Sequence, residues 1–471
     1  MSKTCKYFGK CGGCQTPNLD YPAQLSLKMR KMISVMGRMC HVDEIVGMED
    51  PYHYRNKVQA AFGRQSGHTV CGIYQSGSGR IIPAKSCLLE DERATAIRLA
   101  VQKLAQEMSL TIYNPKNGRG LLRHVMVRVS RATSQAMVVL VTGTSPFTKA
   151  RAFTEALLEM RPDITTVVQC INTTDVPLFM DGRETVLYGS GFMEDVIGGI
   201  RFRVSAKSFL QINPTQTEKL YGLALENAGL TGKETVLDAY CGVGTMSLLA
   251  AGRAKRVIGV EINESAVENA AQNAALNGIR NAEFHAADAG EYMNNLLRQR
   301  TKVDVVLVDP PRAGCSENFL KSLIRLAPEK IVYVSCNPDT LGRDAITLRK
   351  GGYRVERVTP VDMFPFTTHV ESVCLLSKLN AKQHIEINLD MDELDLTDAE
   401  KKATYQEIKD YVLEHSGLKV SSLYIAQVKQ QCGIIERENY NKPKSEDAKQ
   451  PQCPPDKEKA IKEALKHFGM I

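Results

Sequence analysis

The chain has 471 residues, of which 43% are hydrophobic and 24% charged, with a formal net charge of +7. Its length suggests two to four domains, and its composition is that of a soluble globular protein. No apolar run approaches the length of a membrane span and none follows the basic N-terminus, which excludes a membrane-spanning chain and a secretory signal. We expect a cytoplasmic protein with no membrane partner, whose thirteen cysteines serve metal binding or catalysis.

Residues 1–50 form a basic segment with three closely spaced cysteines, Cys5, Cys11 and Cys14. A closed tetrahedral metal site needs a fourth thiol, for which Cys87 is the best candidate and Cys71 the second. Ligation by cysteines alone suits zinc or an iron–sulfur cluster, and the spacing does not separate the two.

Residues 51–203 have a mostly β pattern with helices between the strands. Residues 123–129 alternate polar and apolar side chains, and residues 136–141 and 165–171 are further β-rich runs. A short amphipathic helix is expected over residues 152–160. This stretch predicts a central α+β domain built on an antiparallel sheet.

Residues 204–379 change to strands and helices in alternation. Strands are predicted over 235–237, 256–260, 303–308 and 330–334, and helices over 245–251, 264–277, 317–326 and 341–350. This rhythm predicts a parallel sheet with helices on both faces, which is a Rossmann-like α/β domain.

A glycine-rich turn follows the first strand of this domain, in Leu237-Asp238-Ala239-Tyr240-Cys241-Gly242-Val243-Gly244. Glycines there let the backbone approach a ligand closely. Glu261 ends the next strand, where an acid can accept both ribose hydroxyls of an adenosine. Asp288 follows the third strand and could meet the adenine amino group.

Two cofactors are compatible with a strand, a glycine-rich turn and a helix. A nicotinamide dinucleotide would favour a third glycine where Ser247 stands, and Asp238 would repel its pyrophosphate. S-adenosylmethionine has no phosphate and carries a sulfonium cation, so an acidic loop suits it better. We expect S-adenosylmethionine, because Glu261, Asp288 and Asp309 follow at successive strand ends.

The loop Asp309-Pro310-Pro311-Arg312 ends the fourth strand, Cys336 follows the fifth, and Glu371 lies further along the chain. Carbon 5 of uracil becomes nucleophilic when a thiolate adds at carbon 6, and a base must later remove the proton from carbon 5. Cys336 is predicted to be the nucleophile and Glu371 the base. A cysteine after a strand is more often a small buried hydrophobe, and Cys315 is a weaker candidate nucleophile.

Residues 380–471 have the pattern of a helical extension with a flexible linker. Residues 397–400 form a capping box that would open a helix, which Gly417 would end. Further helices are predicted over 422–431 and 456–468, with a linker over 439–455. Residues 421–433 have a faint helix-turn-helix character, but we prefer a small helical appendage that covers part of the main body.

Five motifs together resemble the RNA (uracil-5-)-methyltransferase family. They are Phe209-Leu210-Gln211-Ile212-Asn213-Pro214, Leu237-Asp238-Ala239-Tyr240-Cys241-Gly242, Asp309-Pro310-Pro311-Arg312-Ala313-Gly314, Ser335-Cys336-Asn337-Pro338 and His369-Val370-Glu371-Ser372. The resemblance, which runs to about Lys378, implies that S-adenosylmethionine is held by Gln211, Tyr240, Glu261 and Asp309, with Asp288 as a further contact. It also implies Cys336 as the nucleophile and Glu371 as the general base.

The resemblance also separates the two kinds of metal site. Members of the family that act on ribosomal RNA carry a [4Fe-4S] cluster on this cysteine motif, whereas bacterial tRNA members generally lack it and archaeal tRNA members have it. It therefore implies a cluster on Cys5, Cys11, Cys14 and Cys87. We expect a monomer that makes 5-methyluridine in 23S ribosomal RNA, either naked or in an assembling large subunit.

Other functions remain open. The chain could be a tRNA 5-methyluridine methyltransferase, or a catalytically idle RNA-binding assembly factor, although Cys336, Glu371 and Asp309 argue against an idle protein. A cytosine-DNA methyltransferase would carry a proline where Ser335 stands. Many relatives have a small β-barrel RNA-binding domain before the cysteines, which we expect to be missing here. RNA contacts are then expected from the basic N-terminal segment and the central domain.

Overall fold

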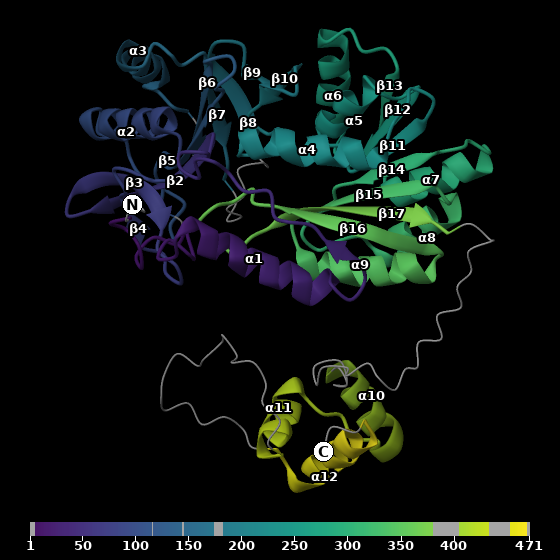
Figure 1. Cartoon of the computed structure of the whole chain (residues 1–471). Coiled ribbons are helices and arrows are strands. Elements are labelled where there is room, and N and C mark those ends of the chain that lie inside the picture. Colours follow the sequence, from purple (N-terminus) through teal and green to yellow (C-terminus); the bar gives the residue numbers. More distant parts are fainter. Residues whose placement is uncertain are drawn as a thin grey trace. The chain divides into compact units, whose positions relative to one another are not determined.

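The computed structural model describes residues 5–114, 116–143, 146–173, 182–379, 405–432 and 453–468. It divides into two units, Met1–Gln383 and His384–Ile471, which are described separately (Figure 1). No helix among the described residues is long and apolar enough to cross a membrane.

An eight-stranded sheet organises the later part of the first unit, in the order β1-β16-β17-β15-β14-β11-β12-β13. Its strands are β1 (His41–Val42), β11 (Thr235–Ala239), β12 (Arg256–Glu261), β13 (Ala282–Ala286), β14 (Val305–Val308), β15 (Lys330–Ser335), β16 (Tyr353–Val361) and β17 (Glu371–Lys378). All neighbours pair in parallel except β17, which runs antiparallel between β15 and β16. The predicted Rossmann-like domain is therefore confirmed, with one reversed strand added.

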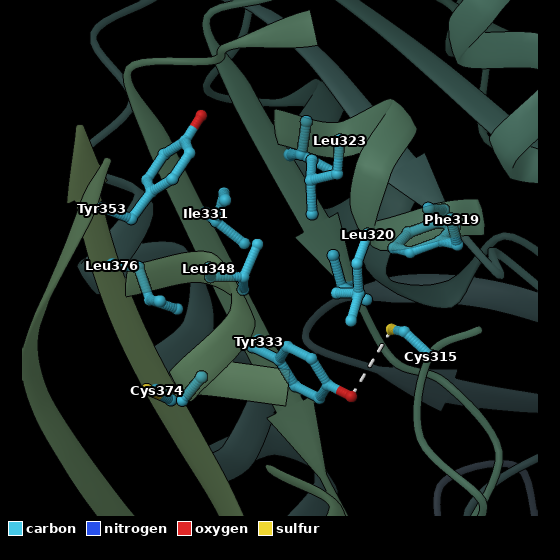
Figure 2. Close-up of a cluster of buried hydrophobic side chains, with 14 of the residues drawn as sticks. Cys315, Phe319, Leu320, Leu323, Ile331, Tyr333, Leu348, Tyr353, Cys374 and Leu376 are labelled. Atoms are coloured by element: carbon cyan, nitrogen blue, oxygen red, sulfur yellow. Dashed lines mark hydrogen bonds between the residues drawn. The ribbon is translucent and has the colours of Figure 1, made fainter. Parts of the chain in front are cut away.

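Helices cover both faces of this sheet. They are α1 (Tyr21–Met36), α4 (Pro214–Ala228), α5 (Thr245–Ala251), α6 (Glu264–Leu276), α7 (Ala289–Arg298), α8 (Glu317–Leu326) and α9 (Pro338–Lys350). Successive strand residues point to opposite faces, so Leu237 packs in a core with α1, α7, α8 and α9, while Val236 packs with α4 and α5. Figure 2 shows part of the first core, where Phe319 and Leu323 of α8 face the strands. Because both faces are covered, the strands are apolar almost throughout.

A seven-stranded sheet organises the central part of the chain, in the order β4-β3-β2-β5-β6-β7-β8. Its strands are β2 (Lys57–Gln65), β3 (His68–Tyr74), β4 (Ile81–Ile82), β5 (Leu122–Val129), β6 (Ala136–Thr142), β7 (Thr166–Ile171) and β8 (Arg183–Tyr188). The sheet is antiparallel except for β6 and β7, which pair in parallel and are joined through α3 (Ala150–Met160). A parallel pair needs such a crossover, and a helix supplies it.

The two faces of the central sheet have different partners. One face packs on α2 (Glu92–Glu107) and α3, as the cluster containing Ile97, Val125 and Phe153 shows. The other face packs on the hairpin of β9 (Phe192–Ile197) and β10 (Ile200–Ser205), together with residues of α5 and α6. This hairpin therefore connects the core of the central sheet to the helices of the parallel sheet.

The second unit contains α10 (Tyr405–Ser416), α11 (Ser422–Gln431) and α12 (Pro455–His467). These helices share a core of their own, which includes Val412, Ile425 and Ile461. Gly417 follows α10 with φ at 69°, which is the left-handed conformation predicted to end that helix. The capping box at 397–400 and most of the predicted linker lie outside the described residues.

Candidate active site

A cleft of about 830 Å³ lies at the carboxyl ends of the parallel strands, where ligands bind in open α/β sheets. It is lined by six of the predicted site residues, Gln211, Tyr240, Glu261, Asp309, Cys336 and Glu371. Residues that the sequence did not single out also line it, among them Tyr221 of α4 and His369. The volume is in the range of pockets that hold a cofactor or a drug-sized ligand.

Cys336 and Glu371 are brought together by the pairing of β15 with β17. Ser335 is the last residue of β15 and lies opposite Ser372 of β17. Cys336 directly follows Ser335 and Glu371 directly precedes Ser372, so both residues lie at the same end of the paired strands, and both line the cleft. The reversed strand β17 thus explains how two residues far apart in sequence share one end of the cleft.

Burial makes ionisation of the acids at this end of the cleft less favourable. Glu371 is 4% exposed, and burial, followed by the nearby Asp309, raises its pKa to about 8. Burial likewise raises the pKa of Asp309 to about 7. Burial, then Glu371 and Asp309, raises the pKa of the Cys336 thiol to about 11, while Arg312 acts in the opposite direction. Positive charge close to these groups would therefore favour their ionised forms.

The turn after β11 has the close backbone geometry that the sequence predicted. Tyr240 has a φ of 71° and Gly244 a φ of 83°, and a Cβ on Gly244 would meet the Ala270 Cβ at 3.0 Å. Glu261 fixes the turn from the next strand, because its Oε2 accepts a hydrogen bond from the Gly242 amide at 3.2 Å. Its Oε1 accepts another from the Asn263 amide at 3.0 Å.

The surroundings of Asp238 indicate which kind of cofactor this loop fits. It is fully buried, and its Oδ2 accepts a hydrogen bond of 2.5 Å from the Ser247 hydroxyl. Its Oδ1 has no hydrogen-bond partner, and burial raises its pKa to about 7. A polyanionic pyrophosphate would add repulsion here, whereas a sulfonium cation would relieve it. The residues present therefore fit S-adenosylmethionine.

Two predicted cofactor residues have different surroundings. The Gln211 side chain lies within hydrogen-bonding reach of the buried Tyr221 hydroxyl, on the wall of the cleft. Asp288 is not among the lining residues, and its Oδ1 caps α7 by accepting a hydrogen bond from the Glu291 amide at 3.0 Å. A role for Asp288 in binding adenine stays a prediction.

Cys315, the weaker candidate nucleophile, points away from the cleft. It is 5% exposed, and its Sγ donates to the Tyr333 hydroxyl at 3.5 Å within the core (Figure 2). Tyr333 in turn donates to Asp344 at 2.7 Å. These contacts give Cys315 a packing role, as expected for a small buried thiol.

A second, smaller cavity of about 60 Å³ is lined by the four predicted ligands Cys5, Cys11, Cys14 and Cys87. Cys71, the other candidate, is fully buried in β3 and does not line it. All four lining thiols are free of disulfides. Within the described ranges, no group of three or more His, Cys, Asp or Glu side chains is arranged to hold a single metal ion.

Backbone amides point at two of these sulfur atoms. The Gly13 amide donates to the Cys11 Sγ at 3.4 Å, and the Leu89 amide donates to the Cys87 Sγ at 3.4 Å. Such hydrogen bonds favour sulfur that carries negative charge, as in a metal-bound thiolate. The Lys85 amide donates to the Tyr7 hydroxyl at 3.0 Å, which fixes the loop of Cys87 to the N-terminal segment.

The fold and the cleft define an S-adenosylmethionine-dependent methyltransferase. A family model described as tRNA (Uracil-5-)-methyltransferase matches residues 196–379. An uncharacterized RNA methyltransferase of Bacillus cereus is 41% identical over 380 residues, which cover 80% of this chain and 83% of that relative. Another, from Clostridium acetobutylicum, is 43% identical over 383 residues, with 80% and 83% covered.

A solved structure is also similar along most of the chain. It is the Pyrococcus abyssi tRNA (uracil-54, C5)-methyltransferase in complex with S-adenosyl-L-homocysteine, with a TM-score of 0.66 and 28% identity. The match covers 78% of this chain and 86% of that one. This chain belongs to the tRNA (uracil-5-)-methyltransferase family, whose members are RNA methyltransferases that use S-adenosylmethionine.

Proposed function

We propose that this protein methylates carbon 5 of a uridine in 23S ribosomal RNA, with Cys336 as nucleophile and Glu371 as general base. The observation that supports this chemistry is that Cys336 and Glu371 both line the cleft, at the end of the paired strands β15 and β17. The proposed cofactor contacts are Gln211, Tyr240, Glu261 and Asp309, with Asp288 as a further one.

The reaction follows from these two side chains. Bound S-adenosylmethionine supplies an electrophilic methyl group on its sulfonium. The Cys336 thiolate would add to carbon 6 of uracil, and the electron pair released at carbon 5 would form the new bond to the methyl carbon, while the bond from that carbon to sulfur breaks and its electron pair stays on sulfur. Glu371 then takes the proton from carbon 5, and the electron pair of that C–H bond expels the Cys336 thiolate. The uracil must leave its stack to reach the cleft, which favours an unpaired or flipped nucleotide.

A [4Fe-4S] cluster on Cys5, Cys11, Cys14 and Cys87 is the second part of the proposal. Each cysteine of such a cluster binds a different iron atom, so the sulfur atoms stand further apart than the ligands of one zinc ion. The four thiols line one cavity, which supports their acting together as one ligand set. Since the proposed methyl transfer involves no oxidation or reduction, we assign the cluster a structural or RNA-positioning role.

The cysteine set is what favours ribosomal RNA, because it resembles the motif of the ribosomal members of the family. The second candidate substrate is tRNA, which is favoured by the name of the similar Pyrococcus abyssi enzyme. Either substrate would be met in the cytoplasm, where we propose that the protein acts as a monomer. RNA contacts are assigned to the basic N-terminal segment and the central domain.

The test is methyl transfer from labelled S-adenosylmethionine, offered separately to unmodified 23S ribosomal RNA and to bulk tRNA. Label that digests to 5-methyluridine, appears on ribosomal RNA and vanishes in Cys336→Ala is the expected result. Label on tRNA alone would keep the chemistry and overturn the substrate. Label on neither naked RNA nor a large-subunit precursor would favour an idle RNA-binding protein.

A further inference from the structure

His369 makes a contact at the rim of the cleft that the reaction scheme above does not use. The Arg312 Nη2 donates a hydrogen bond to the His369 Nδ1, and the two nitrogens are 2.7 Å apart. Both residues line the cleft together with Cys336 and Glu371. Arg312 lies on the loop after β14, and His369 lies two residues before β17, so this bond joins two loops of the site.

The bond fixes the chemical state of the imidazole. A guanidinium has only donors and stays charged, so Nδ1 must be the acceptor and the ring must be neutral, with its proton on Nε2. Burial, then Arg312, Lys28 and Arg55, lowers the pKa of His369, which favours this neutral form. A protonated ring would offer no acceptor and would repel Arg312.

Both partners of the bond are held by further contacts. The Asn337 side chain donates to the Arg312 carbonyl at 3.1 Å, which ties Arg312 to the residue that follows Cys336. The His369 amide donates to the Thr367 hydroxyl at 3.2 Å, and its ring meets Phe364 edge-on at 6.3 Å between centroids. Phe364 is held in turn, since its carbonyl accepts a hydrogen bond from the Lys28 ammonium at 3.0 Å.

Arg312 has a long, exposed side chain, and a free side chain of that kind would sample many rotamers. Its charge opposes the effect of Glu371 and Asp309 on the Cys336 thiol, as described above. The effect of such a charge on a thiol weakens with distance and is largely screened beyond about 10 Å. An acceptor that restrains the guanidinium would therefore change the reactivity of the thiol.

We propose that His369 is a positioning residue, which holds the Arg312 guanidinium beside Cys336 through its neutral Nδ1 and so favours the thiolate. This proposal deepens the proposed function, because it assigns a residue that prepares the nucleophile. It does not depend on which RNA is methylated, and it places His369 outside the proton transfers.

The test measures the thiol directly, without RNA or S-adenosylmethionine. Trypsin releases Cys336 in the peptide from residue 331 to residue 343, which contains no other cysteine. The rate of alkylation of this peptide in the folded protein by iodoacetamide, between pH 7 and 10, reports the thiolate fraction. If the methylation assay fails, this experiment still gives a result, so the two failures are distinguishable.

We expect His369→Ala to slow alkylation of Cys336 by about threefold to tenfold below pH 9, since one pKa unit is a factor of ten in thiolate. Arg312→Ala should slow it by a similar factor, and the double variant should be no slower than Arg312→Ala alone. His369→Asn should restore much of the rate, because its side-chain oxygen can accept the same bond. Exposed His68 provides the matched control, and His68→Ala should alkylate at the wild-type rate.

Three results would overturn the proposal. One is wild-type alkylation in His369→Ala when Arg312→Ala is slow, because Arg312 would then need no anchor. The second is a further slowing by His369→Ala in the Arg312→Ala background, because His369 would then act by another route. The third is a failure of His369→Asn to restore the rate, with circular dichroism unchanged, because the acceptor role would then be wrong.

Discussion

The two cavities of the first unit both bury ionisable side chains, but different kinds of backbone carry those side chains. The cleft gathers carboxyl groups and a thiol at the ends of regular strands, and the cysteine cavity gathers thiols from irregular segments. Burial raises the pKa of Cys14 to about 12 and that of Cys87 to about 11, as it does for the acids of the cleft. In both places a positively charged occupant would compete with these protons, so its binding is expected to release them.

The two cavities also share a wall. Arg55 lines both of them, and the loop 362–370 presents Phe366 to the cysteine cavity and His369 to the cleft. The Phe366 carbonyl accepts hydrogen bonds from the amides of Gln15 and Thr16, at 3.1 Å each, directly after Cys14. The two sites are therefore neighbours, and variants can show whether each keeps its properties when the other is lost.

The largest expected effect is the loss of methyl transfer in a variant of the cleft, which can be compared with the loss of iron in a variant of the cysteine cavity. Cys336→Ala should lower methyl transfer by about 10⁴-fold or more, because no other thiol among the lining residues lies at the end of the paired strands β15 and β17. Cys87→Ala should lower the iron content while its Cys336 peptide still alkylates. Both variants are assayed for methyl transfer and iron, and Cys87→Ala also for alkylation of Cys336. Loss of Cys336 reactivity in Cys87→Ala would show that the sites are not separate.

Glu371→Gln should lower turnover by about 10²- to 10⁴-fold, because a neutral amide cannot take the proton from carbon 5. The covalent protein–RNA adduct should accumulate, which denaturing gel electrophoresis detects as a slow-migrating band. Glu291→Gln, an exposed acid in the first turn of α7, is the matched control and should leave no such band. An unchanged turnover in Glu371→Gln would remove Glu371 as the base.

A buried ion pair holds the loop 362–370 that forms the shared wall, and breaking it should destabilise the protein. The Lys28 Nζ lies 2.5 Å from the Asp362 Oδ1, and both side chains are almost fully buried. Lys28→Met should destabilise the protein by about 3–5 kcal/mol, because it leaves an uncompensated buried carboxylate. Lys31 lies on the same helix as Lys28 and makes an exposed ion pair with Asp339 of α9. Lys31→Met, which breaks this pair, should lower the free energy of unfolding by at most about 1 kcal/mol. Urea unfolding of both variants measures the difference, and equal costs would contradict it.

The smallest effect is a pH dependence of the last step. Burial raises the pKa of Glu371 to about 8, so the fraction ionised is about tenfold lower at pH 7 than at pH 9. Breakdown of the covalent adduct should therefore speed up about tenfold over that range, because Cys336 is bonded and does not titrate. A quench-flow measurement of RNA release checks this. A flat profile would contradict a rate set by ionisation of Glu371.

Much of the parallel sheet could be predicted from sequence, because strands buried on both faces are apolar throughout and alternate with helices. Helices α5 and α8 have the predicted bounds, and the acids at strand ends do line the cleft. Asp288 is the exception, because an acid that follows a strand also makes a good helix cap, and here it caps α7. Local pattern alone does not separate these two uses.

Contacts between distant segments could not be predicted. Strand β1 has two residues and pairs with β16, so it carries no periodicity of its own. The position of α1 depends on Lys28 and Asp362, and the bond between Arg312 and His369 depends on how two loops meet. The only local signal for His369 was its place two residues before Glu371, within a motif already assigned to the base.

The late position of β16 and β17 has a consequence for how the protein is made. Helix α1 needs Asp362 and the core of the last strands, and β1 pairs only with β16, so the N-terminal segment has no final binding place until residues 353–378 are available. Contacts of such long sequence separation slow folding, and they follow the local helices and hairpins. During synthesis the apolar face of α1, with Met32 and Met36, should therefore remain exposed to solvent until the last strands have formed.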